Sequence, residues 1–218
     1  MMMNLFSVFD PSSGIMSLNW LSMLIMVLVT PTQYWNSPNK IIHMLIKLSI
    51  TLMNEIIMHL KKYEQSIIFV SLFMYLLINN VMGLLPYIFT ASSHLAFSLA
   101  LALTIWMSMM LFGWMNKTNH MFSHLVPIGT PNILMPFMVV IESISNLIRP
   151  GSLAVRLTAN MIAGHLLMSL LGNNLSGNFT LMMMMMMMFI ILMMFELAVA
   201  FIQSYVFMTL STLYSSEI

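Results

Sequence analysis

The sequence contains no cysteine and very little charge. Its 218 residues include seven Lys or Arg and six Asp or Glu, so that charged residues make up 6% of the chain. Without thiols, disulfides, thiolate metal sites and cysteine nucleophiles are excluded. An ordinary soluble domain is roughly 25% charged. A chain this apolar cannot cover itself with a polar surface, so lipid must be its main solvent.

Other classes of partner and chemistry are also disfavoured. The net charge is only +1, which gives no electrostatic reason to expect nucleic acid. The chain has no glycine-rich phosphate-binding loop, so we expect no nucleotide chemistry on it. His120 and His124 are spaced as two metal ligands on one helix face, but no further ligand is evident. We therefore expect neither a metal nor a cofactor.

The apolar segments predict an all-α integral membrane protein of a single membrane domain. About 20 apolar residues cross a bilayer, and segments of this kind predict about five transmembrane helices plus one surface amphipathic helix. The surface helix is expected where Lys, His and Glu alternate with Ile, Leu and Met, although a charged loop is the alternative there. The expected parts are a first span at 15–36, the surface helix at 40–62, a helical hairpin at 67–115 and a long tilted hairpin at 131–215.

The last hairpin is too long to cross the membrane upright. Its two segments, at about 132–171 and 179–215, would each measure about 60 Å as a continuous helix. This is about twice the thickness of the hydrocarbon core. Each helix must therefore be strongly tilted or broken, and Pro150-Gly151 can bend the first of them.

The lysines predict the orientation. Five spans place the two termini on opposite sides of the membrane. By the positive-inside rule, the side that carries the lysines faces the matrix or cytoplasm, together with the C-terminus. The lysines on that side are Lys40, Lys47, Lys61, Lys62 and Lys117.

Ionisable residues inside spans are concentrated in the last two segments. Each costs about 2.5–3.5 kcal/mol at the centre of a helix, so each needs a partner or a function. Arg156 is the hardest to explain structurally, because its flanks are apolar. Arg149 can instead extend to the interface, Glu142 can be an interfacial cap or an ion-pair partner, and a simple hydrogen-bonded pair of His165 with Glu196 remains open. The five residues are Glu142, Arg149, Arg156, His165 and Glu196.

Helical geometry groups these residues. Positions 142, 149 and 156 are seven apart, so they return to within about 20° of one direction and form a polar stripe that continues to Asn160. If the last two segments form an antiparallel hairpin whose turn lies near residue 180, Arg156 lies level with Gln203 and His165 lies level with Glu196. Small residues around Arg156 would allow another helix to approach closely.

Several runs of residues resemble one known family. LAVRLTANMIAGH (153–165) and ELAVAFIQSYVF (196–207) resemble the two signatures of subunit a of F-type ATP synthases, and HLVPIGTP (124–131) is similar to the mitochondrial, arthropod-like form. The resemblance implies a proton channel in the mitochondrial inner membrane that is no enzyme by itself. It also implies as partners a ring of small rotor subunits with membrane carboxylates, other stator and membrane subunits, and the lipid bilayer. Arg156 matches the essential arginine beside that ring.

The resemblance also implies roles for the other polar residues. Two half-channels lead to the ring from opposite sides of the membrane. His165 and Glu196 match the pair that lines the inlet from the intermembrane space. Glu142 matches an acidic group of the matrix outlet. Asn160 and Gln203 match polar residues near the arginine.

Two other functions remain alternatives on the sequence alone. A secondary transporter with its own substrate site usually contains internal repeats, and none is seen here. A structural assembly subunit without a conducting role would not need Arg156. The effect of replacing that residue discriminates among the three.

Overall fold

The computed structural model describes residues 5–12, 18–24, 28–30, 35, 37–60, 63–126, 130–131, 133–173 and 179–216. Every regular element in these ranges is a helix, which confirms the all-α prediction. The short 3-10 helices are η1 (Leu5–Phe9), η3 (Leu18–Leu24) and η4 (Ala91–Ser93). The α-helices are α2 (Lys40–Leu60), α3 (Tyr63–Gly83), α4 (Leu95–Asn116), α5 (Thr118–His124), α6 (Met135–Asn173) and α7 (Phe179–Ser216).

Five of the described helices are long and apolar enough to cross a membrane, namely α2, α3, α4, α6 and the part of α7 from Met182 onward. The number of candidate spans in the described residues agrees with the sequence prediction, but the helices that make up the five differ from those predicted. The five include α2, which we assigned to the surface from its charges. Of the expected first span at 15–36, only 18–24, 28–30 and 35 are described, and Leu18–Leu24 is a 3-10 helix. The rest of that span, like Lys61 and Lys62, lies outside the described residues.

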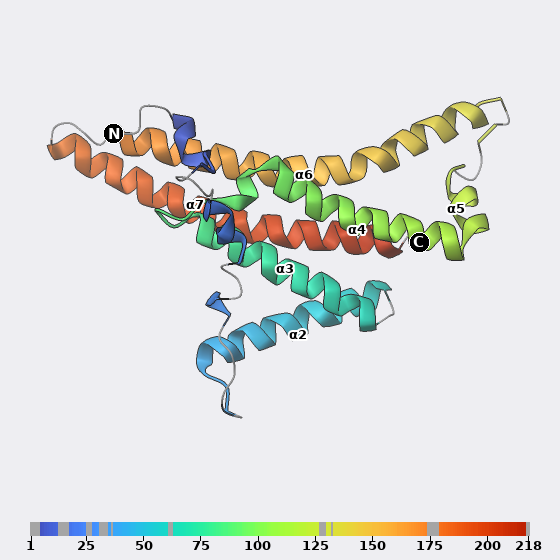
Figure 1. The fold of residues 1–218 in the computed structure, drawn as a ribbon, viewed down its shortest axis with the longest axis horizontal. Coiled ribbons are helices and arrows are strands. Elements are labelled where there is room, and N and C mark those ends of the chain that lie inside the picture. Colours follow the sequence, from blue (N-terminus) through green and yellow to red (C-terminus); the bar gives the residue numbers. More distant parts are fainter. Residues whose placement is uncertain are drawn as a thin grey trace.

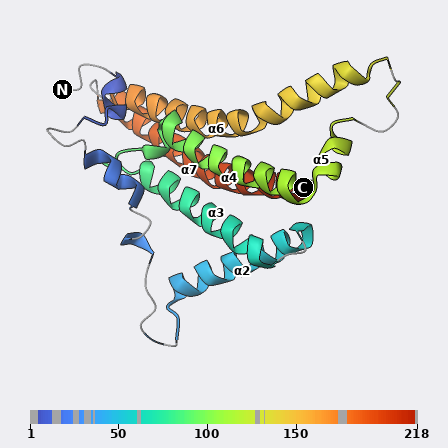
Figure 2. The same cartoon turned by 45° about the vertical axis from the view of Figure 1, so that its right-hand side comes forward.

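The helices form one layered bundle, with α6 at one edge and α2 at the opposite edge (Figure 1). α6 and α7 lie side by side in both views, with α4 against α6 and α3 against α7 (Figure 2). α2 packs beside α3 and also reaches α7. There the Tyr205 hydroxyl donates a hydrogen bond to the Glu55 carboxylate over 3.4 Å. The arrangement makes α6 and α7 the long axis of the molecule.

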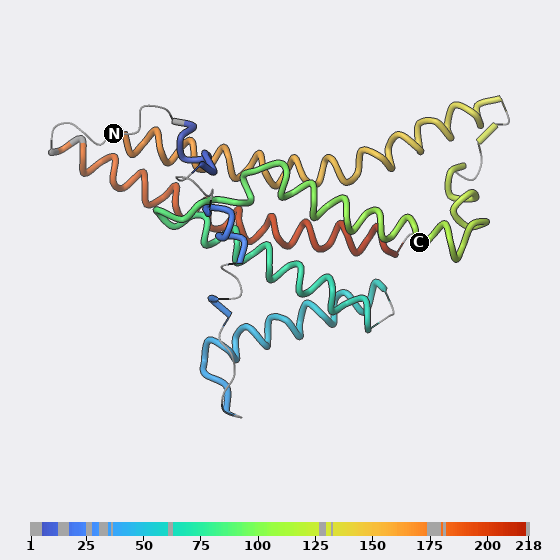
Figure 3. The backbone as a smooth tube through the Cα atoms, in the orientation of Figure 1, coloured from blue at the N-terminus to red at the C-terminus, as the bar shows by residue number. Residues whose placement is uncertain are grey.

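α6 is continuous through its internal proline. The helix has 39 residues, about 58 Å at 1.5 Å per residue. Pro150 has no N–H to donate to the carbonyl one turn earlier, which favours a bend. The backbone trace of α6 curves over its length (Figure 3). A helix of this length fits the hydrocarbon core only when it is steeply inclined.

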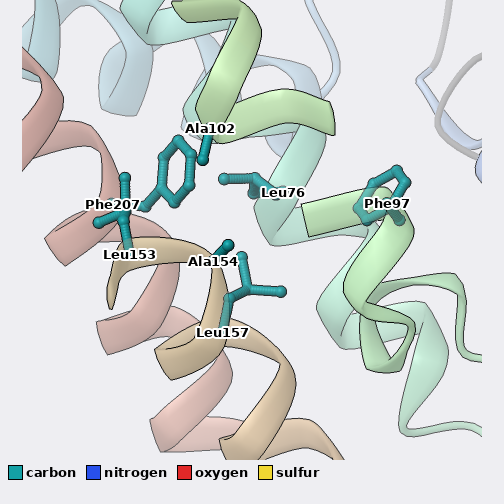
Figure 4. Packing of buried hydrophobic residues seen from close by; sticks show 7 residues of the cluster. All are labelled: Leu76, Phe97, Ala102, Leu153, Ala154, Leu157 and Phe207. Carbon is teal, nitrogen blue, oxygen red and sulfur yellow. The ribbon is translucent and has the colours of Figure 1, made fainter. Parts of the chain in front are cut away.

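The central packing cluster fixes which way α6 faces. Leu153, Ala154 and Leu157 point from α6 into a cluster shared with α3, α4 and α7 (Figure 4). Its other members are Leu76, Phe97, Ala102 and Phe207. Inside a bilayer, close packing of this kind holds helices together, because lipid is as apolar as the side chains. The residues on the opposite side of α6 are therefore turned away from the bundle.

We expect Leu157→Ala to destabilise the fold. Leu157 is 0% exposed, and truncating a buried leucine leaves a cavity at a cost of about 2 kcal/mol or more. The midpoint of thermal unfolding in detergent measures the loss. Leu170→Ala, on the same helix at a 45% exposed position, is the matched control. An equal loss in both variants would contradict the packing described for this cluster.

Candidate functional site

Arg156 lies on the outward face of α6. Its side chain is exposed, while Leu153 and Leu157 on either side of it are buried. It makes no hydrogen bond or ion pair with any residue in the described ranges. A guanidinium in an apolar membrane domain needs a compensating group. The counter-charge of Arg156 must therefore come from outside this part of the chain.

The surface around Arg156 is smooth. Ser152, Val155, Ala159 and Ala163 are exposed at helical spacing on the same side of α6. Small side chains let the backbone of a neighbouring helix approach closely. This face therefore combines one fixed positive charge with a surface on which another helix can pack.

Asn160 and Gln203 join α6 to α7 one turn beyond Arg156. The Asn160 amide Nδ2 donates to Gln203 Oε1 over 2.9 Å. Gln203 is only 5% exposed, and its own Nε2 has no hydrogen-bond partner in the described structure. The sequence places Gln203 level with Arg156, whereas the observed register pairs it with Asn160. Both amides still lie next to the arginine, because Asn160 follows it by a single helical turn.

Glu196 is buried against the backbone of α6. Its side chain is 5% exposed, and its carboxylate contacts the position that a side chain of residue 164 would occupy. Gly164 is therefore required for this arrangement. The sequence predicts that Glu196 lies level with His165, the residue after Gly164. Glu196 and His165 form no hydrogen bond or ion pair in the described structure. A glycine thus makes room for an acid inside the bundle.

His165 lies near the C-terminal end of α3. Its imidazole packs edge-on against Phe9 of η1, with the ring centroids 6.2 Å apart. The backbone of Gly83 lies within hydrogen-bonding reach of the ring. The ring nitrogen Nε2 is buried and has no partner among the described residues. This histidine therefore keeps an unused hydrogen-bonding position inside the protein.

A group of polar residues that our sequence analysis missed lies at the same end of the bundle. Asn79, Asn80, Ser92 and His94 each have a buried side-chain atom without a described partner. They belong to α3, to η4 and to the residue after η4, and η4 packs against α6. Leaving such groups unpaired costs about 1–3 kcal/mol each, and buried polar groups of this kind commonly bind water. The adjacent asparagines in an apolar helix were the signal available in the sequence.

Glu142 and Arg149 form a second polar region toward the other end of α6. The Arg149 Nη2 atom lies 3.8 Å from Glu142 Oε1, and the guanidinium lies 4.9 Å above the Tyr214 ring of α7. The pair lines a cavity of about 460 Å³ between α4, α5, α6 and α7. Arg149 is thus held within the chain, unlike Arg156.

Arg156 lies between these two regions along one helix. It follows Glu142 by 14 residues, which is about 21 Å of helix. It precedes His165 by nine residues, which is about 14 Å. An exposed cation therefore separates two polar regions that lie toward opposite ends of α6, one buried around Glu196 and one half-buried around Glu142.

Within the described ranges, no group of three or more His, Asp or Glu residues is arranged to hold a metal ion. The rings of His120 and His124 lie 4.6 Å apart on α5. They are two potential ligands without a third.

Comparisons with known proteins agree in the family that they find. The family described as ATP synthase A chain matches residues 15–216. The "ATP synthase subunit a" of Drosophila melanogaster is 56% identical over 223 residues, and that of Anopheles gambiae is 53% identical over 225 residues. The protein of the same name from Locusta migratoria is 53% identical over 224 residues. Each alignment covers 100% of both chains.

We expect the hydrogen bond between Asn160 and Gln203 to make the effects of substitutions at these two positions on stability non-additive. Removing one amide leaves the other without its partner inside the membrane domain, at a cost of about 1–3 kcal/mol. Replacing both by Leu should cost less than the two single changes added together, because no unpaired amide remains. Thermal unfolding of Asn160→Leu, Gln203→Leu and the double variant measures this coupling. Strictly additive losses would argue against the bond.

Proposed function

The chain belongs to the ATP synthase A chain family, and from this premise and its geometry we propose that it is the proton-translocating stator subunit of a rotary ATP synthase. It is a multi-pass membrane protein that works as one subunit of a multi-subunit enzyme, and the nucleotide chemistry resides on other subunits. The observation that carries the proposal is the exposed position of Arg156 between two polar regions of α6.

The proposed partner of Arg156 is a ring of small rotor subunits, each with a carboxylate within the membrane. The smooth face of α6 around Arg156 supports such a partner, because a ring must slide past it. Arg does not release its proton at any accessible pH, so it cannot relay protons itself. It favours the ionised form of a carboxylate that comes close. A ring carboxylate must therefore give up its proton before it can pass Arg156.

We assign the inlet to the region around His165 and Glu196. The buried carboxylate of Glu196 and the unpaired Nε2 of His165 are groups that accept and release protons. The unpaired atoms of Asn80 and Ser92 support a hydrated approach to them, since buried water needs polar partners. Asn160 and Gln203 continue this polar region toward Arg156. In this assignment protons enter from the intermembrane space.

We assign the outlet to the region around Glu142. The cavity of about 460 Å³ beside Glu142 and Arg149 offers space for water at the end of α6 away from His165. Because Arg156 lies between the two regions, a proton cannot cross directly from one to the other past its fixed positive charge. It must travel on the ring instead. This is the coupling of proton flow to rotation.

The same proposal places the C-terminal end of α7 on the matrix side of the mitochondrial inner membrane. The end of α7 lies together with Lys117, because both line one cavity at the ends of α2, α4 and α7. The positive-inside rule puts lysines on the matrix side.

We place α2 on the membrane surface, because Lys40, Lys47 and Glu55 along it would be costly in hydrocarbon. Other stator and membrane subunits would cover the remaining exposed apolar faces.

Replacing the arginine tests the proposal. We expect Arg156→Ala to abolish ATP-driven proton pumping, because nothing then separates the two proton paths. Assembly of the complex should survive, since the side chain contributes no described contact within the chain. Acidification of vesicles containing the complex measures pumping, and native gel electrophoresis measures assembly.

Val155→Ala, which makes the adjacent exposed side chain smaller and so keeps this face smooth, is the matched control and should retain pumping. Intact pumping by Arg156→Ala would refute the channel assignment and favour a structural subunit. Transport of a substrate in the absence of the rotor ring would instead favour a secondary transporter.

The two glycines of α6 provide a second test. An alanine at Gly164 would take the space of the Glu196 carboxylate, which can move because it ends a flexible side chain. We expect Gly164→Ala to assemble but to pump protons several-fold more slowly. Gly172→Ala adds a methyl group where no atom lies within 4 Å, so its rate should be unchanged. Equal rates in the two variants would remove Glu196 from the proposed inlet.

A further inference from the structure

A cavity outside the proposed proton path lies where four helix ends meet. It has a volume of about 510 Å³, within the range of roughly 300–1,000 Å³ typical of ligand sites. The residues that line it come from the end of α2, the start of α3, the second half of α4 and the last residues of α7, together with Lys117 after α4. None of the residues named in the proton path lines it.

The lining has two chemically distinct parts. One part is polar. Lys117, His59 and Gln65 can donate hydrogen bonds to an anion. The hydroxyls of Ser108, Ser215 and Ser216 also line this part, and each donates to a carbonyl of its own helix. The other part is apolar and includes Ile68, Phe69, Ile105, Met109 and Phe112. No Asp or Glu is among the described residues that line the cavity. The cavity therefore matches a ligand with an anionic end and a hydrocarbon end.

The position along the helices fits the same ligand. α2 ends at Leu60, α3 begins at Tyr63, α4 ends at Asn116 and α7 ends at Ser216. The polar part thus lies where α3, α4 and α7 meet the membrane surface, beside the end of the surface helix α2, and the apolar part lies along α3 and α4. Basic pockets between membrane helices on the matrix or cytoplasmic side are a recognised type of site for anionic lipid headgroups.

We propose that this cavity binds an anionic phospholipid, with its phosphate beside Lys117 and His59 and an acyl chain along Ile105 and Phe112. An ammonium has three donors, so Lys117 can bind a phosphate in addition to its contacts within the chain. Such a lipid would join the end of α7 to α4 and to the α2–α3 pair. It would thereby steady the helix that carries Glu196 and Gln203.

The sequence that flanks the cavity carries charges of both signs. Lys61 and Lys62 follow Leu60, and Glu217 follows Ser216; all three lie outside the described residues. The proposal uses only Lys117 and His59 as basic groups.

The test uses the intact complex in nanodiscs of phosphatidylcholine to which cardiolipin is added. Native mass spectrometry counts the cardiolipin molecules retained, and thermal inactivation measures their effect on stability. We expect Lys117→Gln to weaken retention by about fivefold, the factor typical of one lysine near anionic lipid. Adding His59→Gln should weaken it further, because a hydrogen-bond donor is removed. Lys47→Gln, which removes an exposed lysine that does not line the cavity, should retain cardiolipin as the unmodified protein does.

A second variant separates the acyl-chain part from the charges. Ser108→Trp places a large ring in the cavity at an exposed position of α4, and it should displace the lipid while both basic groups remain. Normal proton pumping by both variants would show that the complex is intact. The proposal is overturned if neither variant changes retention, if Lys47→Gln lowers it equally, or if inorganic phosphate stabilises the complex as well as cardiolipin does.

Discussion

A permanently charged guanidinium on the exposed side of a helix in an apolar membrane domain is the constraint on which the other features depend. Hydrocarbon does not tolerate such a charge without a compensating group, and the described chain provides none for Arg156. The burial of Leu153, Ala154 and Leu157 on the other side of α6 prevents the helix from turning the charge inward. The protein therefore presents Arg156 on an outer face, and we propose that a partner in the membrane sector compensates its charge.

The interior supports this arrangement by giving each end of α6 a polar region of its own. At one end, Gly164 makes room for the Glu196 carboxylate, and His165 keeps an unpaired nitrogen. At the other end, Glu142 and Arg149 line a cavity. The difference between the two arginines is instructive. Arg149 has an acid and an aromatic ring within the chain, so it is satisfied structurally. Arg156 has neither among the described residues, and we propose that a partner subunit compensates its charge.

Some of the site residues were predicted from the sequence, and others were missed. Ionisable residues within apolar runs are visible in any sequence, because their cost in hydrocarbon makes them conspicuous. The proximity of Asn160 and Gln203 was predictable to within one helical turn, since an antiparallel hairpin restricts which residues of its two helices can lie side by side. The exact pairing was not, because the inclination of two packed helices shifts their register. Asn79, Asn80, Ser92 and His94 were missed. Asparagines in membrane helices and polar residues in the links between helices are common, and only the tertiary structure shows that these four have buried atoms without a described partner.

The sequence by itself determined the class of the protein, because a chain with 6% charge and long apolar runs can only be solvated by lipid, and lipid requires every backbone group to be bonded within a helix. It also determined that the last two helices are too long to stand upright. Only the tertiary structure decided which face of α6 is covered, which glycine lies against Glu196, and where the ends of α2, α3, α4 and α7 enclose a cavity. These features depend on contacts between segments that are distant in the chain, and helical periodicity defines the faces of a helix without specifying which neighbour covers them.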